Sequence, residues 1–167
     1  MTTVATNFSG GASILGDTSG NAVPAGYVGE KITWASAPST QSVTTSYADW
    51  TNASITLTAG VWLVQANINC IVTSGTTAGN DGELQIRITD SSNNVLQNLE
   101  KILRVKTPAN AETINAGCLN FSGIFNYSTS SNVLKIRIRM NNVNGTNSGT
   151  VYNAGTVYSE FFAIRIA

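Results

Sequence analysis

Alternation of apolar and polar residues with a period of two runs through most of the chain after residue 30. The clearest stretch is 61–72. Its apolar positions are Trp62, Val64, Ala66, Ile68, Cys70 and Val72. Gln65, Asn67 and Asn69 occupy the opposite face. Because successive side chains of a strand point to opposite faces, this pattern predicts a strand with one face on a core.

The same alternation recurs at 84–88 and 134–140. In the second segment Ile136 and Ile138 alternate with Arg137 and Arg139, so we expect the isoleucines in a core and the arginines outside it. In the C-terminal segment 158–166, apolar residues occupy both faces. Tyr158, Phe162, Ile164 and Ile166 share one face, and Phe161 and Ala163 share the other. We therefore expect the last strand to be buried on both sides.

Glycine and asparagine mark the turns between these segments, as at 58–60, 78–82, 91–94 and 144–145. Further strands are expected at 31–35, 53–58 and 119–127. Residues 95–106 fit either one face of a helix or an alternating strand, and the neighbouring strands favour the second. Seven to nine short strands predict an all-β protein, an antiparallel β-sandwich or jelly roll.

The first 29 residues differ from the rest. They contain six glycines and no sustained period, and they hold too little apolar material to fold alone. We expect residues 1–29 to form an extended N-terminal arm that a neighbouring subunit or a larger assembly holds in place. Residues 30–167 are then the jelly-roll domain.

Composition narrows the function classes. Nine basic and nine acidic residues cancel in a chain of 167, which argues against nucleic acid or an anionic membrane as a partner. The chain has no histidine, which removes the commonest general base and the commonest metal ligand. We therefore expect a non-enzymatic protein. No signal peptide and no membrane-spanning run is visible, so we also expect a soluble one.

Cys70 and Cys118 both lie in apolar, strand-like segments. We expect two buried free thiols from a reducing compartment, with a disulfide between adjacent strands as the alternative.

Few residues present candidate chemistry. Asp81 and Glu83, in a glycine-rich turn, are weak calcium candidates, and the alternative is a solvated loop. Arg137 and Arg139 line one strand face that is either solvated or turned to another subunit. Arg165 is a further interface candidate on a strand, and the sequence leaves open whether it belongs to the same layer. The polar segment 141–155 is expected to be a loop that binds a sugar or simply connects two strands. No cofactor and no metal are expected.

Three segments carry a resemblance to a known family. They are Gly-Tyr-Val-Gly-Glu at 26–30, the two strands and tight turn at 50–64, and Phe-Ala-Ile-Arg-Ile-Ala at 162–167. Together they resemble small bacteriophage virion proteins, namely fibre tips and capsid decoration proteins with the jelly roll of complement and tumour-necrosis-factor-type trimer heads. The resemblance implies a homotrimer with apolar and aromatic residues around a threefold axis. The residues expected in its core or trimer contact are Trp62, Ile136, Ile138, Phe161, Phe162 and Ile164.

Two functions follow from this resemblance. The first is a capsid decoration (cement) protein of the virion, made in the bacterial cytoplasm, whose arm binds the major capsid protein. The second is a receptor-binding fibre tip, whose arm docks on a tail component while a loop contacts host glycan. The absence of a coiled-coil or fibrous repeat favours the first.

Overall fold

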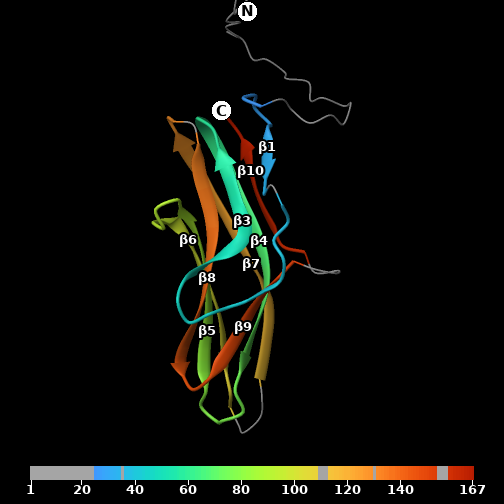
Figure 1. Cartoon of the computed structure of the whole chain (residues 1–167), viewed down its shortest axis with the longest axis vertical. Helices are drawn as coiled ribbons and strands as arrows, with labels where there is room; N and C mark the ends of the chain where they lie inside the picture. Colours follow the sequence, from blue (N-terminus) through green and yellow to red (C-terminus); the bar gives the residue numbers. More distant parts are fainter. Residues whose placement is uncertain (1–24, 35, 109–112, 130, 154–157) are drawn as a thin grey trace, which may run out of the picture.

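Two antiparallel β-sheets lie face to face in the computed structural model of the chain (Figure 1). The structure describes residues 25–34, 36–108, 113–129, 131–153 and 158–167. Within these ranges there is no helix, and hence none that could cross a membrane. The predicted antiparallel β-sandwich is confirmed. Most of the expected arm, residues 1–24, lies outside the described residues.

The larger sheet is built around β4. Its hydrogen-bonded order is β1-β10-β4-β9-β2, and β7 pairs with the other edge of β4. The strands are β1 (Lys31–Thr33), β2 (Gln41–Ser42), β4 (Gly60–Ser74), β7 (Thr113–Tyr127), β9 (Asn147–Tyr152) and β10 (Glu160–Arg165). On one edge, β4 pairs first with β10 and then with β9. On the other edge it pairs with β7 along its whole length, so β4 joins both halves of the sheet.

The smaller sheet has the order β3-β8-β5-β6. Its strands are β3 (Ala48–Leu57), β5 (Asp81–Asp90), β6 (Val95–Lys106) and β8 (Asn132–Asn144). Residues 95–106 are therefore a strand, as the neighbouring segments favoured. A bulge interrupts the β3–β8 ladder, and Asn52 takes a left-handed φ of 66° there.

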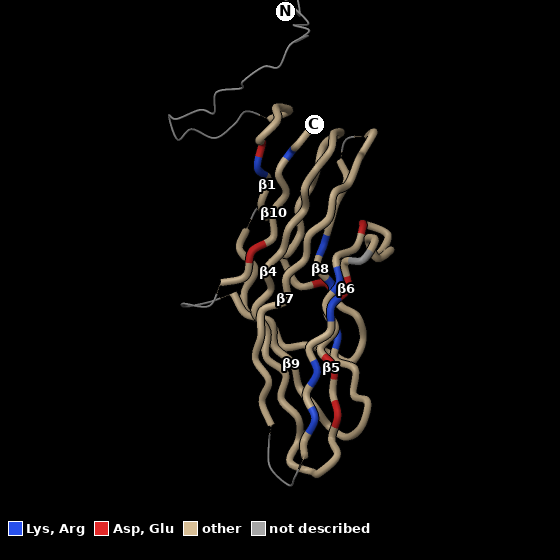
Figure 2. The backbone as a smooth tube through the Cα atoms, turned by 180° about the vertical axis from the view of Figure 1, so that it is seen from behind, with Lys and Arg blue, Asp and Glu red and all other residues tan. Residues whose placement is uncertain are grey.

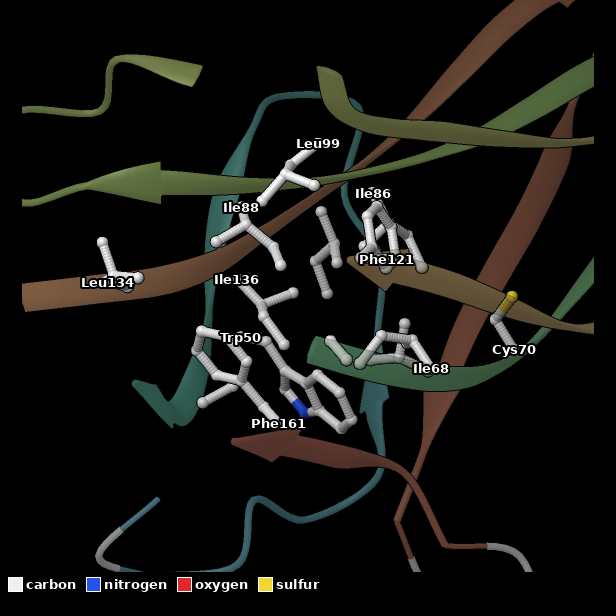
Figure 3. Close-up of a cluster of buried hydrophobic side chains, with 14 of the residues drawn as sticks. Trp50, Ile68, Cys70, Ile86, Ile88, Leu99, Phe121, Leu134, Ile136 and Phe161 are labelled. Carbon is white, nitrogen blue, oxygen red and sulfur yellow. The ribbon is translucent and has the colours of Figure 1, made fainter. Parts of the chain in front are cut away.

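The core lies between the two sheets and consists of the inward side chains of both (Figure 3). Trp62, Phe161, Ile136 and Ile138 are all 0% exposed. Alternation explains this arrangement, since every second residue of β4 and β8 is buried. On β10 the neighbours of Phe161 point the other way: Phe162 and Ile164 are half-buried on the outer face of the larger sheet.

The expectation of a loop at 141–155 was wrong for most of its length. β8 continues to Asn144, β9 starts at Asn147, and a tight turn with Gly145 at φ 74° joins them. Apolar alternation is weak here because two of the three inward positions of β9 are Asn147 and Gly149. The Asn147 side-chain NH2 group donates to the Asp81 carbonyl at 3.1 Å. Residues 154–157 lie outside the described residues.

The expectation of two buried thiols holds for only one cysteine. Cys70 is buried, whereas Cys118 is exposed, and both are free. In the register of β4 and β7, Cys118 lies opposite Asn69, while Cys70 lies opposite Gly117. The two thiols therefore point to opposite faces of the sheet, which excludes a disulfide between them within one chain.

Candidate functional site

Charged residues are divided unequally between the two sheets (Figure 2). β4 and β7, with 15 residues each, contain none, and neither does β9. β5, β6 and β8 together carry seven of the nine basic residues of the chain. The molecule therefore has one charged outer face, on the smaller sheet, and one largely uncharged outer face, on the larger sheet.

The uncharged face consists of apolar rows with an amide band between them. In one row, near the start of β4, the residues Ile164, Leu63 and Ile124 lie side by side across β10, β4 and β7. Ile124 is 66% exposed and, at the lower end, Ile114 is 60% exposed. The polar band between them is formed by the cross-strand pairs Gln65 with Ser122 and Asn67 with Asn120. We call the outer positions of β4 and β7 the uncharged face.

A shallow cavity of about 460 Å³ opens on the lower half of the uncharged face. Ile71, Ala116, Cys118 and Tyr152 are among its lining residues, and Cys70 is another. Burial raises the pKa of the Cys70 thiol to about 12, and desolvation also raises the pKa of Cys118. Because the thiolate is the reactive form of cysteine, neither residue has the properties of a catalytic nucleophile at neutral pH.

On the charged face, Tyr47 lies at the centre of an arginine cluster. The Arg87 guanidinium carbon is 3.4 Å from the Tyr47 ring centroid, and that of Arg139 is 4.5 Å away. The Tyr47 hydroxyl donates to Glu100 at 2.8 Å. Burial, followed by this carboxylate, raises the pKa of Tyr47. Tyr47 therefore packs between two arginines of the charged face and bonds to a carboxylate of the same chain.

The interface candidates Arg137 and Arg139 both belong to this network. Arg137 pairs with Asp49 through Nε at 2.9 Å and donates to the Tyr47 carbonyl at 2.8 Å. Arg139 donates to the Gln85 amide oxygen at 2.7 Å. Both guanidinium groups thus have intramolecular partners, which reduces what they offer to another subunit.

Arg165 lies on β10 of the larger sheet and so does not belong to the arginine layer of the smaller sheet. Its Nε donates to Glu30 at 3.0 Å, and the two side chains are only 7% and 9% exposed. Other Arg165 donors reach Ala59 and Thr58, and the guanidinium lies over the Trp62 ring. We call this group the clasp, because it ties residue 30 to the last strand and to the β3–β4 turn.

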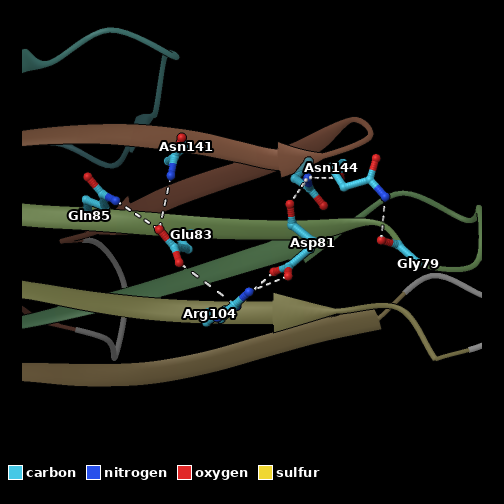
Figure 4. A network of polar contacts seen from close by, with 8 residues as sticks. Gly79, Asp81, Glu83, Gln85, Arg104, Asn141 and Asn144 are labelled. Atoms are coloured by element: carbon cyan, nitrogen blue, oxygen red, sulfur yellow. Dashed lines mark hydrogen bonds and ion pairs between the residues drawn. The ribbon is translucent and has the colours of Figure 1, made fainter.

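The weak calcium candidates Asp81 and Glu83 both lie beside the guanidinium group of Arg104 (Figure 4). Arg104 Nε donates to Asp81 at 2.9 Å and lies 3.9 Å from Glu83. This hydrogen bond lowers the pKa of Asp81. Glu83 also accepts from Gln85 and Asn141. In the part of the chain that the structure describes, no three acidic, histidine or cysteine residues gather as a metal site would require.

Sequence reasoning missed Tyr47 and Trp34. Tyr47 lies outside the predicted strands, just before β3, whereas Trp34 falls in the predicted strand 31–35 but follows the end of β1 at Thr33. The sequence feature that could have indicated them is an aromatic residue among polar residues beside a short strand, since such aromatic residues are normally buried or engaged in binding.

Comparison with known proteins does not assign the chain to a family. No protein-family model matches the chain, and no curated protein matches it significantly. A chain from the T13 IBDV viral particle is similar over 82% of this chain, with 11% identity and a TM-score of 0.36. A chain from the infectious bursal disease virus Gx strain covers the same share, with 12% identity and a TM-score of 0.31. The match spans only 35% and 36% of those chains, and at these scores it supports no functional argument.

Proposed function

We propose that this chain is a non-enzymatic structural protein of a bacteriophage virion: a homotrimeric cement protein that attaches through residues 1–29 and stabilises the shell. The observation that carries the proposal is the uncharged face. A soluble domain rarely leaves so much of one sheet without a single charge unless another protein covers it. The resemblance of 26–30, 50–64 and 162–167 to small phage virion proteins supplies the virion context.

The chemistry of the uncharged face favours a copy of the same chain as the partner. Asparagine, glutamine and serine side chains both donate and accept hydrogen bonds, so an amide band can pair with an identical band. A face with net charge would repel its own copy. Apolar residues above and below the band, such as Ile124 and Ile114, supply area to bury. Three copies that turn this face toward a common axis form a closed assembly.

The proposed attachment segment leaves the domain at a well-anchored point. The clasp holds Glu30 beside the last strand, and the Gly26 amide donates to the same carboxylate at 2.7 Å. The segment before residue 25 therefore starts from a defined position. Binding only to the assembled shell would stabilise that shell by mass action.

The trimer is tested by a charge placed on the uncharged face. Ile124→Arg should lower the mass in solution, measured by light scattering, from three times the 17.5 kDa of the chain to the monomer value. The matched control is Ile102→Arg on β6, because Ile102 is also exposed, at 51%, but lies on the charged sheet. A wild-type monomer, or a trimer that survives Ile124→Arg but not Ile102→Arg, would contradict the proposed interface.

The virion role is tested by counting copies in purified particles relative to the major capsid protein, with quantitative mass spectrometry. A ratio of the same order supports decoration of the whole shell. A ratio lower by one to two orders would place the protein on the tail or a vertex, as a fibre tip requires. Complete absence from particles would overturn the virion role itself.

The attachment segment is tested by deleting residues 1–25. The shortened protein should keep the circular dichroism and the trimer mass of the full chain, since the deletion stops before the clasp. It should no longer bind particles that lack the protein. Full binding by the shortened protein would exclude residues 1–25 as the anchor.

A further inference from the structure

A second cavity lies at the β1–β10 edge of the larger sheet, outside the strands that form the uncharged face. Its volume is about 350 Å³. Three aromatic residues and three polar or charged residues make up most of its lining: Trp34, Tyr158, Phe162, Lys31, Asn153 and Glu160. A cavity that receives an apolar side chain of another protein would have a mainly apolar lining, and this cavity does not. We call it the aromatic cavity.

The walls of the aromatic cavity are held in place from behind. Trp34 packs edge-to-face on Trp50, with ring centroids 6.1 Å apart, and Trp50 is 1% exposed. On the opposite side Asn153 donates to the Pro38 carbonyl at 2.8 Å and accepts from the Ser159 amide at 3.0 Å. The cavity is therefore pre-formed, which reduces the entropy lost when a ligand binds.

The polar groups of the aromatic cavity have unused bonding capacity. Lys31 Nζ lies 4.6 Å above the Phe162 ring and makes no ion pair with any described residue. The Glu160 carboxylate accepts one long bond, from Asn67 at 3.5 Å. The Tyr158 hydroxyl has no hydrogen-bond partner among the described residues, and Tyr158 is 65% exposed. A donor, an acceptor and a hydroxyl thus remain available around an aromatic surface.

From this combination we infer that the aromatic cavity binds a neutral saccharide. A sugar ring has apolar C–H faces, which pack on aromatic rings, and a rim of hydroxyls that both donate and accept. Lys31 and Glu160 bring opposite charges to the site, so neither an anionic nor a cationic ligand is favoured. A quaternary ammonium group is further disfavoured because the Lys31 ammonium already occupies the face of Phe162.

The saccharide site borders the proposed trimer interface without sharing its lining residues, since Phe162 and Glu160 of β10 lie opposite Gln65 and Asn67 of β4. In the order β1-β10-β4, with β7 beyond β4, the aromatic cavity is at one edge and Ile124 is on the strand at the other. Saccharide binding goes beyond the proposed function. Its test measures ligand affinity and the trimer test measures mass, so the failure of one is distinguishable from the failure of the other.

The test is a titration of the full-length protein with three neutral trisaccharides, maltotriose, tri-N-acetylchitotriose and globotriose, followed by calorimetry and tryptophan fluorescence. Trp34 reports on the cavity because Trp50 and Trp62 are 1% and 0% exposed. We expect saturable binding of at least one probe with a Kd on the order of 1 mM, as for a small, open site. Tyr158→Ala and Glu160→Ala should each weaken this binding at least tenfold.

Tyr27→Ala is the matched control, since Tyr27 is also 65% exposed but lies outside the cavity. It should leave the affinity unchanged. N-acetylneuraminic acid and choline are the charged comparison probes. The inference is overturned if no trisaccharide binds at concentrations up to about 20 mM, if Tyr158→Ala and Glu160→Ala bind like the wild type, or if only a charged probe binds.

Discussion

Trp62 shows how one residue links the core to the chain ends. Its ring is fully buried, its indole N–H donates to the Thr58 carbonyl at 3.0 Å, and Arg165 lies over its face at 4.4 Å. Trp62→Ala should therefore lower the free energy of unfolding by about 3–5 kcal/mol, since it leaves a large cavity. Urea denaturation followed by circular dichroism measures this. Ile102→Ala, at an exposed position, should change it by less than about 0.5 kcal/mol.

The Glu30–Arg165 pair should behave differently from the ion pairs on the charged face. Glu30→Ala leaves a buried guanidinium without its carboxylate, and we expect a loss of about 3–5 kcal/mol. Asp49 pairs with Lys135 and Arg137, but its side chain is 50% exposed. Asp49→Ala should lower the free energy of unfolding by about 1 kcal/mol or less, because water screens such pairs. Equal losses in the two variants would show that the clasp is not a buried pair.

At the scale of strands, the paired carboxylate of Asp81 joins β5 to β6 and makes stability depend on acid. The Arg104 hydrogen bond lowers the pKa of folded Asp81 below its unfolded value of about 3.9. Its contribution is fully present above that value and is lost as the pH falls through the folded pKa. The urea concentration at the midpoint of unfolding should be constant between about pH 5 and 8, because the chain has no histidine to titrate in that range. It should fall below about pH 4.

Asp81→Asn should reduce the acid-dependent part of this curve. The wild type should be more stable than the variant at neutral pH, and the two curves should converge as the pH falls. A constant difference between them down to about pH 2 would show that the Asp81 carboxylate does not contribute through its charge.

The strands that the sequence predicts correctly share a clear alternation of apolar and polar residues. β4 and β8 have it over their whole buried length, so the local pattern alone assigns Trp62, Ile136 and Ile138 to the inner face. β9 lacks it, because its inward positions include Asn147 and Gly149. Their burial depends on strand β5 of the opposite sheet, where the Asp81 carbonyl accepts from Asn147. Tertiary contacts of this kind are invisible in a local pattern.

The same limit applies to the candidate sites. The alternation places Arg137 outside the core, but its pairing with Asp49 depends on which strands are neighbours. The exposure of Cys118 depends on the register of β7 against β4. The aromatic cavity joins residues that are more than 100 positions apart, such as Trp34 and Tyr158, so no spacing in the sequence could indicate it.

For the whole molecule, the uncharged face predicts how the two thiols react. Cys118 is exposed on the face that we propose to be covered in the trimer, whereas Cys70 is buried in the fold itself. In the Ile124→Arg variant, Cys118 should react with a maleimide reagent while Cys70 stays protected. In the wild-type trimer both should be protected, and mass spectrometry of the labelled peptides separates the two cases. Equal labelling of Cys118 in wild type and variant would contradict burial of the uncharged face.

The clasp also has a mechanical consequence. Force applied to the segment before residue 25 reaches the domain through β1, a strand of three residues, and through the Glu30–Arg165 pair beside it. β4, by contrast, is secured along both edges by much longer ladders. A pull on the N-terminal segment should therefore open the clasp and detach β1 before β4 separates from its neighbours, so that the released strand adds length while the sandwich is still folded.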